Sequence, residues 1–187
     1  TWFKKSRGWV DYLSRCQFML REGQPVADVL YFTSDTNVGE SGPYTPATPA
    51  GYEFDVVAAS QLQTLTVNSR GQIVLPVGKT YELLVYSNTG FDTDRALEQL
   101  HRLASEGATI LGTKPTYNPS LKERKNGAVN FGKNIEKLWG SASSDKGERK
   151  IGKGRVMWGY DTSEVLDQRD VVKAIDYYGG DLTLQHT

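Results

Sequence analysis

Residues 26–40 read VADVLYFTSDTNVGE, and the abrupt change of character within them decides the fold prediction. The segment 27–32 is almost continuously apolar, which is typical of a strand buried on both faces of a parallel sheet. The segment 33–51 contains three prolines, three glycines and several Ser and Thr residues. We therefore predict a buried strand that opens onto a long irregular loop, and such loops in compact domains are usually functional or mobile.

Three further apolar segments predict strands of the same kind, with amphipathic segments between them. Strands are expected at 81–88, 108–112 and 154–159, and a β-hairpin insertion at about 65–76. Helices are expected at about 9–22, from Asp92 or Thr93 to Gly107, and around 131–139, with short helices within 55–62 and 163–175. This alternation favours a single α/β domain over residues 1–187, a mainly parallel sheet covered by helices on both faces.

The composition argues against several classes of protein. Lys+Arg and Asp+Glu each total 22 in 187 residues, so no charge excess indicates nucleic acid or a membrane surface as partner. No run of 18 apolar residues occurs, and the first residues lack the apolar core of a signal peptide. One cysteine and two histidines argue against a metal site, and no phosphate-binding fingerprint follows the first strand. We therefore expect no metal and no cofactor.

Polar residues follow three of the predicted strands, where a parallel sheet offers a ligand site. Ligands of open parallel sheets bind beyond the carboxyl ends of the strands. The chain leaves three strands at Thr33, Ser87 and Thr113, so these positions should share one edge. The residues that we predict to face a substrate there are Thr33, Asp35, Glu40, Asn88, Thr113 and Tyr117. The alternative is that these loops are polar only because water surrounds them.

Four carboxylates near this edge are candidates for hydrolytic chemistry. Paired carboxylates at a suitable separation hydrolyse glycosidic bonds, and Asp35, Glu40, Asp55 and Asp92 follow the first two strands or begin the next element. Asp55 and Asp92 have a simpler explanation as helix caps. The two loop carboxylates are more simply explained as solvated charges.

Cys16 is the only candidate thiol nucleophile. An amidotransferase nucleophile lies on a tight turn between a strand and a helix, with a histidine nearby. Cys16 instead falls on the apolar stripe of the first predicted helix, with Trp9, Leu13 and Leu20. We therefore interpret it as a small hydrophobic residue of the core.

The segment GERKIGKG (147–154) resembles a phosphate loop in its spacing. Gly147, Gly152 and Lys153 match, but Gly154 replaces the hydroxyl residue that would bind magnesium, and the segment leads into a strand instead of a helix. The basic residues at 146–155 have no interleaved aromatic residues for base stacking. We interpret this segment as a solvated basic loop.

The order of several motifs resembles one family of enzymes. The segments are YLSRCQFMLREGQPVADVLYF, GYEFDVVAASQLQTLTVNSRGQIVLPVGKTYELLVYSN, ALEQLHRLASEGATILGTKPTYNPSL, LWG and GKGRVMWG. Their order resembles a domain of large bacterial glycoside hydrolases of the α-L-rhamnosidase type, which act on plant cell-wall glycans. The residues at the family's motif positions are Arg15, Gln17, Gly23, Asp28, Gly51, Asp55, Gly71, Pro76, Gly107, Gly112, Pro115, Pro119 and Leu121. The loop 33–50 departs from the family pattern.

The resemblance implies a flavodoxin-like, class I amidotransferase-like domain, similar to the trimerisation domain of some β-galactosidases. In such enzymes the catalytic carboxylates lie on a separate (β/α) barrel, and 187 residues are too few to contain that barrel as well. The resemblance therefore implies a non-catalytic auxiliary domain that packs on the catalytic and β-rich domains of one polypeptide and lines the glycan cleft. It is compatible with a homo-oligomer, and it implies a periplasmic or secreted enzyme, because enzymes of this type are commonly exported. The alternative is a stand-alone flavodoxin-like module that binds a glycan or another partner.

Overall fold

A computed structural model of the chain describes residues 2–23, 25–33, 44–87, 92–120, 127–141, 144–173, 175–178 and 181–184. Its main body is a six-stranded sheet in the order β2-β1-β6-β7-β9-β8. The five strands from β2 to β9 are mutually parallel, and β8 pairs with β9 in the antiparallel sense. Their bounds are β1 Val29–Thr33, β2 Phe54–Val57, β6 Leu83–Ser87, β7 Thr109–Gly112, β8 Gly147–Ile151 and β9 Gly154–Trp158. The mainly parallel α/β fold predicted from the sequence is therefore confirmed.

The apolar residues of each strand alternate between the two faces of the sheet. In β1, Leu30 and Phe32 join the larger core cluster, whereas Val29 and Tyr31 join the smaller one on the other face. All four of these side chains are fully buried. Since side chains of a strand alternate with period two, a strand buried on both faces needs the continuous apolar run that the sequence has here.

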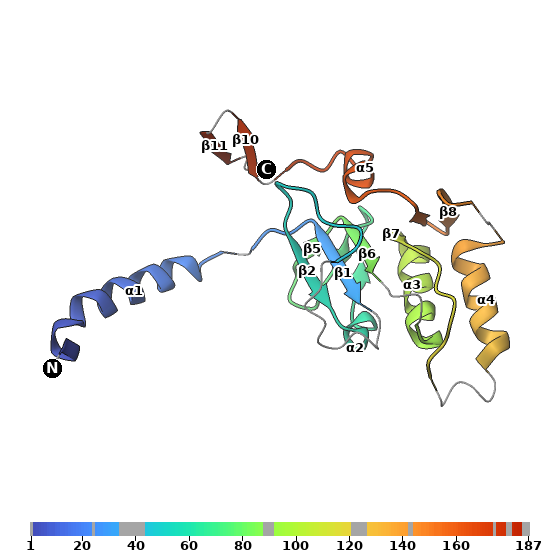
Figure 1. Ribbon diagram of the computed structural model, residues 1–187, viewed down its shortest axis with the longest axis horizontal. Coiled ribbons are helices and arrows are strands. Elements are labelled where there is room, and N and C mark those ends of the chain that lie inside the picture. Colours follow the sequence, from blue (N-terminus) through green and yellow to red (C-terminus); the bar gives the residue numbers. More distant parts are fainter. Residues whose placement is uncertain are drawn as a thin grey trace.

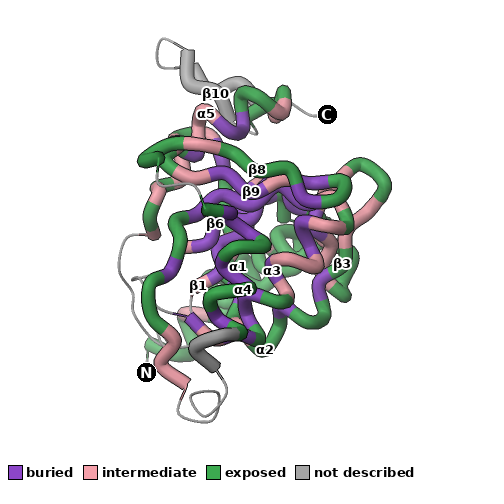
Figure 2. Tube along the Cα trace, turned by 90° about the vertical axis from the view of Figure 1, so that its right-hand side faces the viewer, coloured by how far each residue is buried: buried purple, intermediate pink, exposed green. Residues whose placement is uncertain are grey.

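The helices cover the two faces unequally. Figure 1 shows α3 (Asp94–Glu106) and α4 (Gly127–Trp139) beside each other, and together with α2 (Ala59–Leu62) they supply apolar side chains to the larger cluster. The described part of the opposite face carries the short helix α5 (Thr162–Asp167), through Val165 and Leu166, and aromatic side chains from loops. Figure 2 shows the buried residues gathered along the central strands and the helix faces against them.

A second, antiparallel sheet has the order β3-β4-β5. Its strands are Thr66–Val67, Ile73–Val74 and Thr80–Tyr81, so the predicted hairpin is confirmed and gains a third strand. A third pairing joins β10 (Ile175–Tyr178) to β11 (Asp181–Leu184), which the sequence did not predict.

Two elements correct the sequence prediction. The segment that begins at Asp55 starts as strand β2, and only residues 59–62 are helical, so Asp55 is not a helix cap. Asp55 instead accepts hydrogen bonds from Lys79 Nζ at 2.5 Å and from the Tyr81 hydroxyl at 2.6 Å. The segment GERKIGKG is likewise not a loop but strand β8 and its turn into β9. Helix α3 agrees with its prediction, because Thr93 is the N-cap and Gly107 the C-cap.

Helix α1 (Arg7–Leu20) does not pack on this body. The helix forms as predicted, but it has no buried residue, and it extends away from the sheet at one end of the molecule (Figure 1). The exposed fractions on its apolar stripe are 62% for Trp9, 58% for Tyr12 and 74% for Met19. Cys16 lies on this stripe and is half-buried, so its predicted place in the core is wrong for the described chain.

Candidate functional site

The carboxyl ends of the central strands meet at one edge, as the sequence predicted. Thr33 at the end of β1 is in register with Ser87 at the end of β6, and Thr113 directly follows the last residue of β7. The strand order reverses between β1 and β6, which makes Thr33 and Ser87 the flanks of a topological switch point. Thr45 lies against this switch point, because its backbone N–H donates a hydrogen bond to Ser87 Oγ at 3.0 Å.

A buried polar cluster stabilises the same edge beside β7. Asp94 is 8% exposed and accepts hydrogen bonds from Asn118 Nδ2 at 3.3 Å and Asn134 Nδ2 at 3.2 Å. Asp92 is fully buried, and its backbone N–H donates to the carbonyl oxygen of Tyr117 at 3.0 Å. These bonds hold the loop after β7 against the start of α3.

The predicted substrate-facing residues are thus only partly located. Thr33, Thr113 and Tyr117 lie on this edge, and Tyr117 is 50% exposed. Asp35, Glu40 and Asn88 lie outside the described residues. Contact of any of the six with a substrate stays a prediction.

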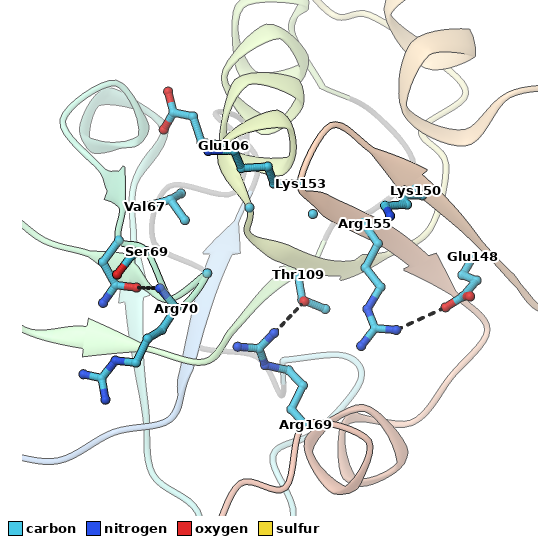
Figure 3. A pocket seen from close by; sticks show the side chains of 14 residues that line it. Val67, Ser69, Arg70, Glu106, Thr109, Glu148, Lys150, Lys153, Arg155 and Arg169 are labelled. Carbon is cyan, nitrogen blue, oxygen red and sulfur yellow. Dashed lines mark hydrogen bonds and ion pairs between the residues drawn. The ribbon is translucent and has the colours of Figure 1, made fainter.

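A cavity of about 710 Å³ lies at the opposite edge, where β7 and β9 begin. It is lined by residues of the turn after β3, the end of α3, the β8–β9 hairpin and the segment after α5 (Figure 3). Five basic side chains and two acidic ones line it, and we call it the basic pocket: Arg70, Lys150, Lys153, Arg155 and Arg169, with Glu106 and Glu148. Sequence reasoning missed it, although Lys150, Lys153 and Arg155 belong to the basic segment that it treated as a loop.

A network of hydrogen bonds supports one wall of the basic pocket, which is lined there by Asn68, Thr109 and Arg169. Glu82 accepts from Arg169 Nη2 at 2.6 Å and from Gln72 Nε2, and Gln72 in turn accepts from Asn68 Nδ2 at 2.8 Å. Arg169 Nη1 donates to Thr109 Oγ1 at 2.9 Å. These hydrogen bonds therefore link the small sheet, the main sheet and the segment after α5.

Two carboxylates near this wall have pKa values that are shifted in opposite directions. Burial, followed by repulsion from Glu82, raises the pKa of Asp28. Burial also opposes ionisation of Asp55, but the hydrogen bonds from Lys79 and Tyr81 and the charge of Lys79 outweigh it and lower the pKa of Asp55. Asp55 is therefore a stable anion within an ion pair, whereas the surroundings of Asp28 disfavour its ionised form.

The described residues do not bring the thiol, the described histidine or possible metal ligands together into a site. Cys16 lies in α1, away from the strand ends, and His101 lies within α3, where burial and the nearby Lys137 and Arg149 lower its pKa. Among the residues that the structure describes, no group of three or more His, Cys, Asp or Glu side chains is placed to hold a metal ion. No helix in this part of the chain combines the length and apolar character needed to cross a membrane.

The fold defines the class of protein: the chain is an α/β domain in which a small antiparallel sheet accompanies a mainly parallel sheet. The chain belongs to the glycoside hydrolase family 106, described as alpha-L-rhamnosidase, whose model matches residues 1–186. A rhamnosidase structure from Novosphingobium sp. PP1Y superimposes on 96% of this chain with a TM-score of 0.80 and 28% sequence identity. A protein of Formosa agariphila named "Putative beta-glucuronidase" is 31% identical over 140 residues, which are 75% of this chain.

The chain corresponds to a small part of these relatives. It spans 17% of the Novosphingobium chain and 12% of the Formosa protein. Other domains of one polypeptide are therefore implied, and the chain is a segment of a rhamnosidase-like glycoside hydrolase.

Proposed function

We propose that this chain is a non-catalytic auxiliary domain of an α-L-rhamnosidase-like hydrolase, which packs on the domain that carries the catalytic carboxylates. The observation that carries the proposal is the exposed apolar stripe of α1. Trp9, Tyr12, Leu13, Met19 and Leu20 follow helical spacing and are 37–83% exposed. An isolated apolar stripe of this kind indicates a protein partner, and the relatives are several times longer than this chain.

Four of the described carboxylates support a structural role for the domain. Glu82 pairs with Arg169, Asp55 with Lys79 and Glu164 with Lys146. Asp94 is held between two asparagine amides. A glycosidase acid pair must instead face a sugar across an open site.

The topology supports a flavodoxin-like, amidotransferase-like domain of the kind found in β-galactosidase trimerisation domains. The five parallel strands follow the order second, first, third, fourth, fifth in the sheet, which is the flavodoxin-like order. Ligands of such sheets bind at the switch point, so the edge formed by Thr33, Ser87 and Thr113 is the part of this domain that would line a glycan cleft. We also propose that the parent enzyme is periplasmic or secreted, which cell fractionation with an antibody against this chain would test.

The non-catalytic role is tested with the purified 187-residue chain and an aryl α-L-rhamnoside. We expect no release of the aryl group above the enzyme-free rate, whereas the whole polypeptide encoded by the gene should release it. Turnover by the chain alone would show that it holds its own catalytic groups, and the proposal would be wrong.

The packing role is tested by Leu13→Asp in the whole polypeptide, with Ser14→Asp as the matched control. Leu13 lies on the apolar stripe, and Ser14 lies on the opposite side of α1. We expect L13D to lower the melting temperature and the activity of the whole polypeptide, and S14D to leave both unchanged. Equal values for L13D and the unaltered polypeptide would rule out α1 as the packing element.

A further inference from the structure

We propose that the basic pocket binds the carboxylate of an acidic saccharide. The choice of a saccharide rests on the proposed function, but the pocket itself rests on its own geometry. Neither the family description nor the relatives' names assign a site to the edge where β7 and β9 begin.

The charges of the basic pocket favour an anion. Arg155 is neutralised by Glu148 at 3.4 Å, and Arg169 by Glu82 at 2.6 Å. Glu106 is held by Arg102 at 3.1 Å. Arg70, Lys150 and Lys153 have no ion pair within the described part of the chain, so the pocket keeps an excess of positive charge.

The strands place these charges on one side of the hairpin. Glu148 and Lys150 are two residues apart in β8, and Lys150 is in register with Arg155 of β9, so all three share a face. Arg149 belongs to the other face and lies against Gly140, at the end of α4. In Figure 3 the side chain of Arg169 lies between the turn 68–71 and the side chain of Arg155, whereas the side chain of Arg70 points away from strand β9.

The wall of the basic pocket is organised before any ligand arrives. Arg169 is held by Glu82 and Thr109, and its side chain is 15% exposed. Its Nε–H is buried and has no acceptor among the residues that the structure describes. Nη1 and Nη2 each have a second N–H, whose direction is fixed by the bonds to Thr109 and Glu82, and guanidinium groups match carboxylate geometry.

The remaining lining selects the class of anion. The described residues that line the pocket include no aromatic side chain, so they offer no platform on which a nucleobase would stack. The pocket adjoins the C-terminal end of α3, where the helix dipole is negative, and two glutamates line it, which disfavours a multiply charged phosphate. Ser69, Asn68 and Thr109 add small polar groups suited to sugar hydroxyls, and about 710 Å³ is ample for a short saccharide. These features together favour a singly charged, hydroxyl-rich ligand.

The test is calorimetric titration of the 187-residue chain with a trisaccharide that carries a single glucuronate residue, and with a neutral trisaccharide for comparison. We expect saturable binding of the glucuronate-containing trisaccharide that weakens with salt, and no binding of the neutral sugar. Arg70→Gln combined with Lys153→Gln should weaken binding at least tenfold, and Lys150→Gln provides an independent second variant. Lys114→Gln is the matched control, because Lys114 is exposed and lies after β7, at the opposite edge of the sheet.

Four results would overturn the proposal. They are equal binding of the neutral sugar, tighter binding of a short poly-glutamate peptide, displacement by inorganic sulfate at equal concentration, and equal weakening by K114Q. The second result would assign the pocket to an acidic protein segment, the third to anions in general and the fourth to diffuse surface charge. None of these results affects the rhamnoside and α1 experiments, so the two proposals fail separately.

Discussion

At the scale of single residues, Asp28 is the clearest case of a side chain that the fold disfavours. It is half-buried, one of its carboxylate oxygens has no partner among the described residues, and Glu82 lies near enough to raise its pKa. Its backbone carbonyl oxygen, in contrast, accepts from the backbone N–H groups of Glu82 and Leu83. The backbone of Asp28 therefore stabilises the sheet, whereas its charge opposes folding.

We expect Asp28→Asn to stabilise the chain at neutral pH. Because the folded-state pKa is raised above the ordinary value of 3.8, the folded chain keeps a proton that the unfolded chain loses, and the stability of the unaltered chain falls as pH rises through this window. The gain from D28N should vanish below that window and reach a plateau above it. Melting curves at several pH values measure this, and each 1 kcal/mol would raise the melting temperature by about 2–4 °C. A pH-independent difference would contradict the explanation.

Gly154 marks a close approach of two backbones. A Cβ at this position would lie 2.2 Å from the carbonyl oxygen of Ala108 and 2.5 Å from that of Ala104. Since backbone atoms cannot move aside as a side chain does, we expect Gly154→Ala to cost about 1–3 kcal/mol or more in the free energy of unfolding.

Gly132 is the matched control for this substitution. It lies within α4 and would meet nothing within 4 Å of an added Cβ. Gly132→Ala should therefore be neutral or slightly stabilising, because alanine is the better helix former. Denaturant unfolding compares the two variants, and equal midpoints would contradict the packing argument.

At the scale of elements, Glu82 couples the two sheets. It precedes β6 and accepts from Gln72, next to β4, and from Arg169, after α5. We expect Glu82→Gln to cost about 1.5–3 kcal/mol, because it leaves a largely buried guanidinium without its carboxylate. Glu106→Gln, which breaks an exposed ion pair four residues apart on α3, should change stability by less than about 0.5 kcal/mol. A loss for E82Q no larger than that for E106Q, measured by urea unfolding, would contradict the coupling.

The two edge strands of the main sheet, β2 and β8, were not predicted as strands from the sequence. Strands β1, β6, β7 and β9 lie inside the sheet and have the apolar runs that their burial requires. Strand β2 is at one edge, where Phe54 and Val56 are 42% and 43% exposed, and its mixed pattern led to a helix prediction. Strand β8 is at the other edge, and its Glu, Arg and Lys residues are of the kind that protects exposed edges from further pairing.

At the scale of the whole molecule, α1 and the sheet should differ in stability. Helix α1 has 14 residues and buries none of them, and isolated helices of this length are marginal in water. We expect hydrogen exchange in the 187-residue chain to be fast for the amides of α1 and slow for those of β1 and β6. Mass spectrometry of peptides from the two regions measures this. Similar protection of both regions would show that α1 already packs on this body and would remove the support for a separate partner.

The sequence by itself determined the α/β class, the inner strands, the hairpin and the limits of α3. These features depend on local pattern: apolar runs, helical spacing and capping residues lie within a few positions of one another. Thr33, Ser87 and Thr113 could also be assigned to one edge, because parallel strands bring their carboxyl ends together.

Only the tertiary structure decided the basic pocket and the surroundings of α1. The lining of the pocket comes from segments near residues 68, 107, 150 and 169, and no local pattern relates such distant segments. The apolar stripe of α1 predicted burial in the core, which is wrong for the described chain, because burial of a stripe depends on what lies against it. In the described chain nothing covers it, because the helix extends away from the sheet and has no buried residue.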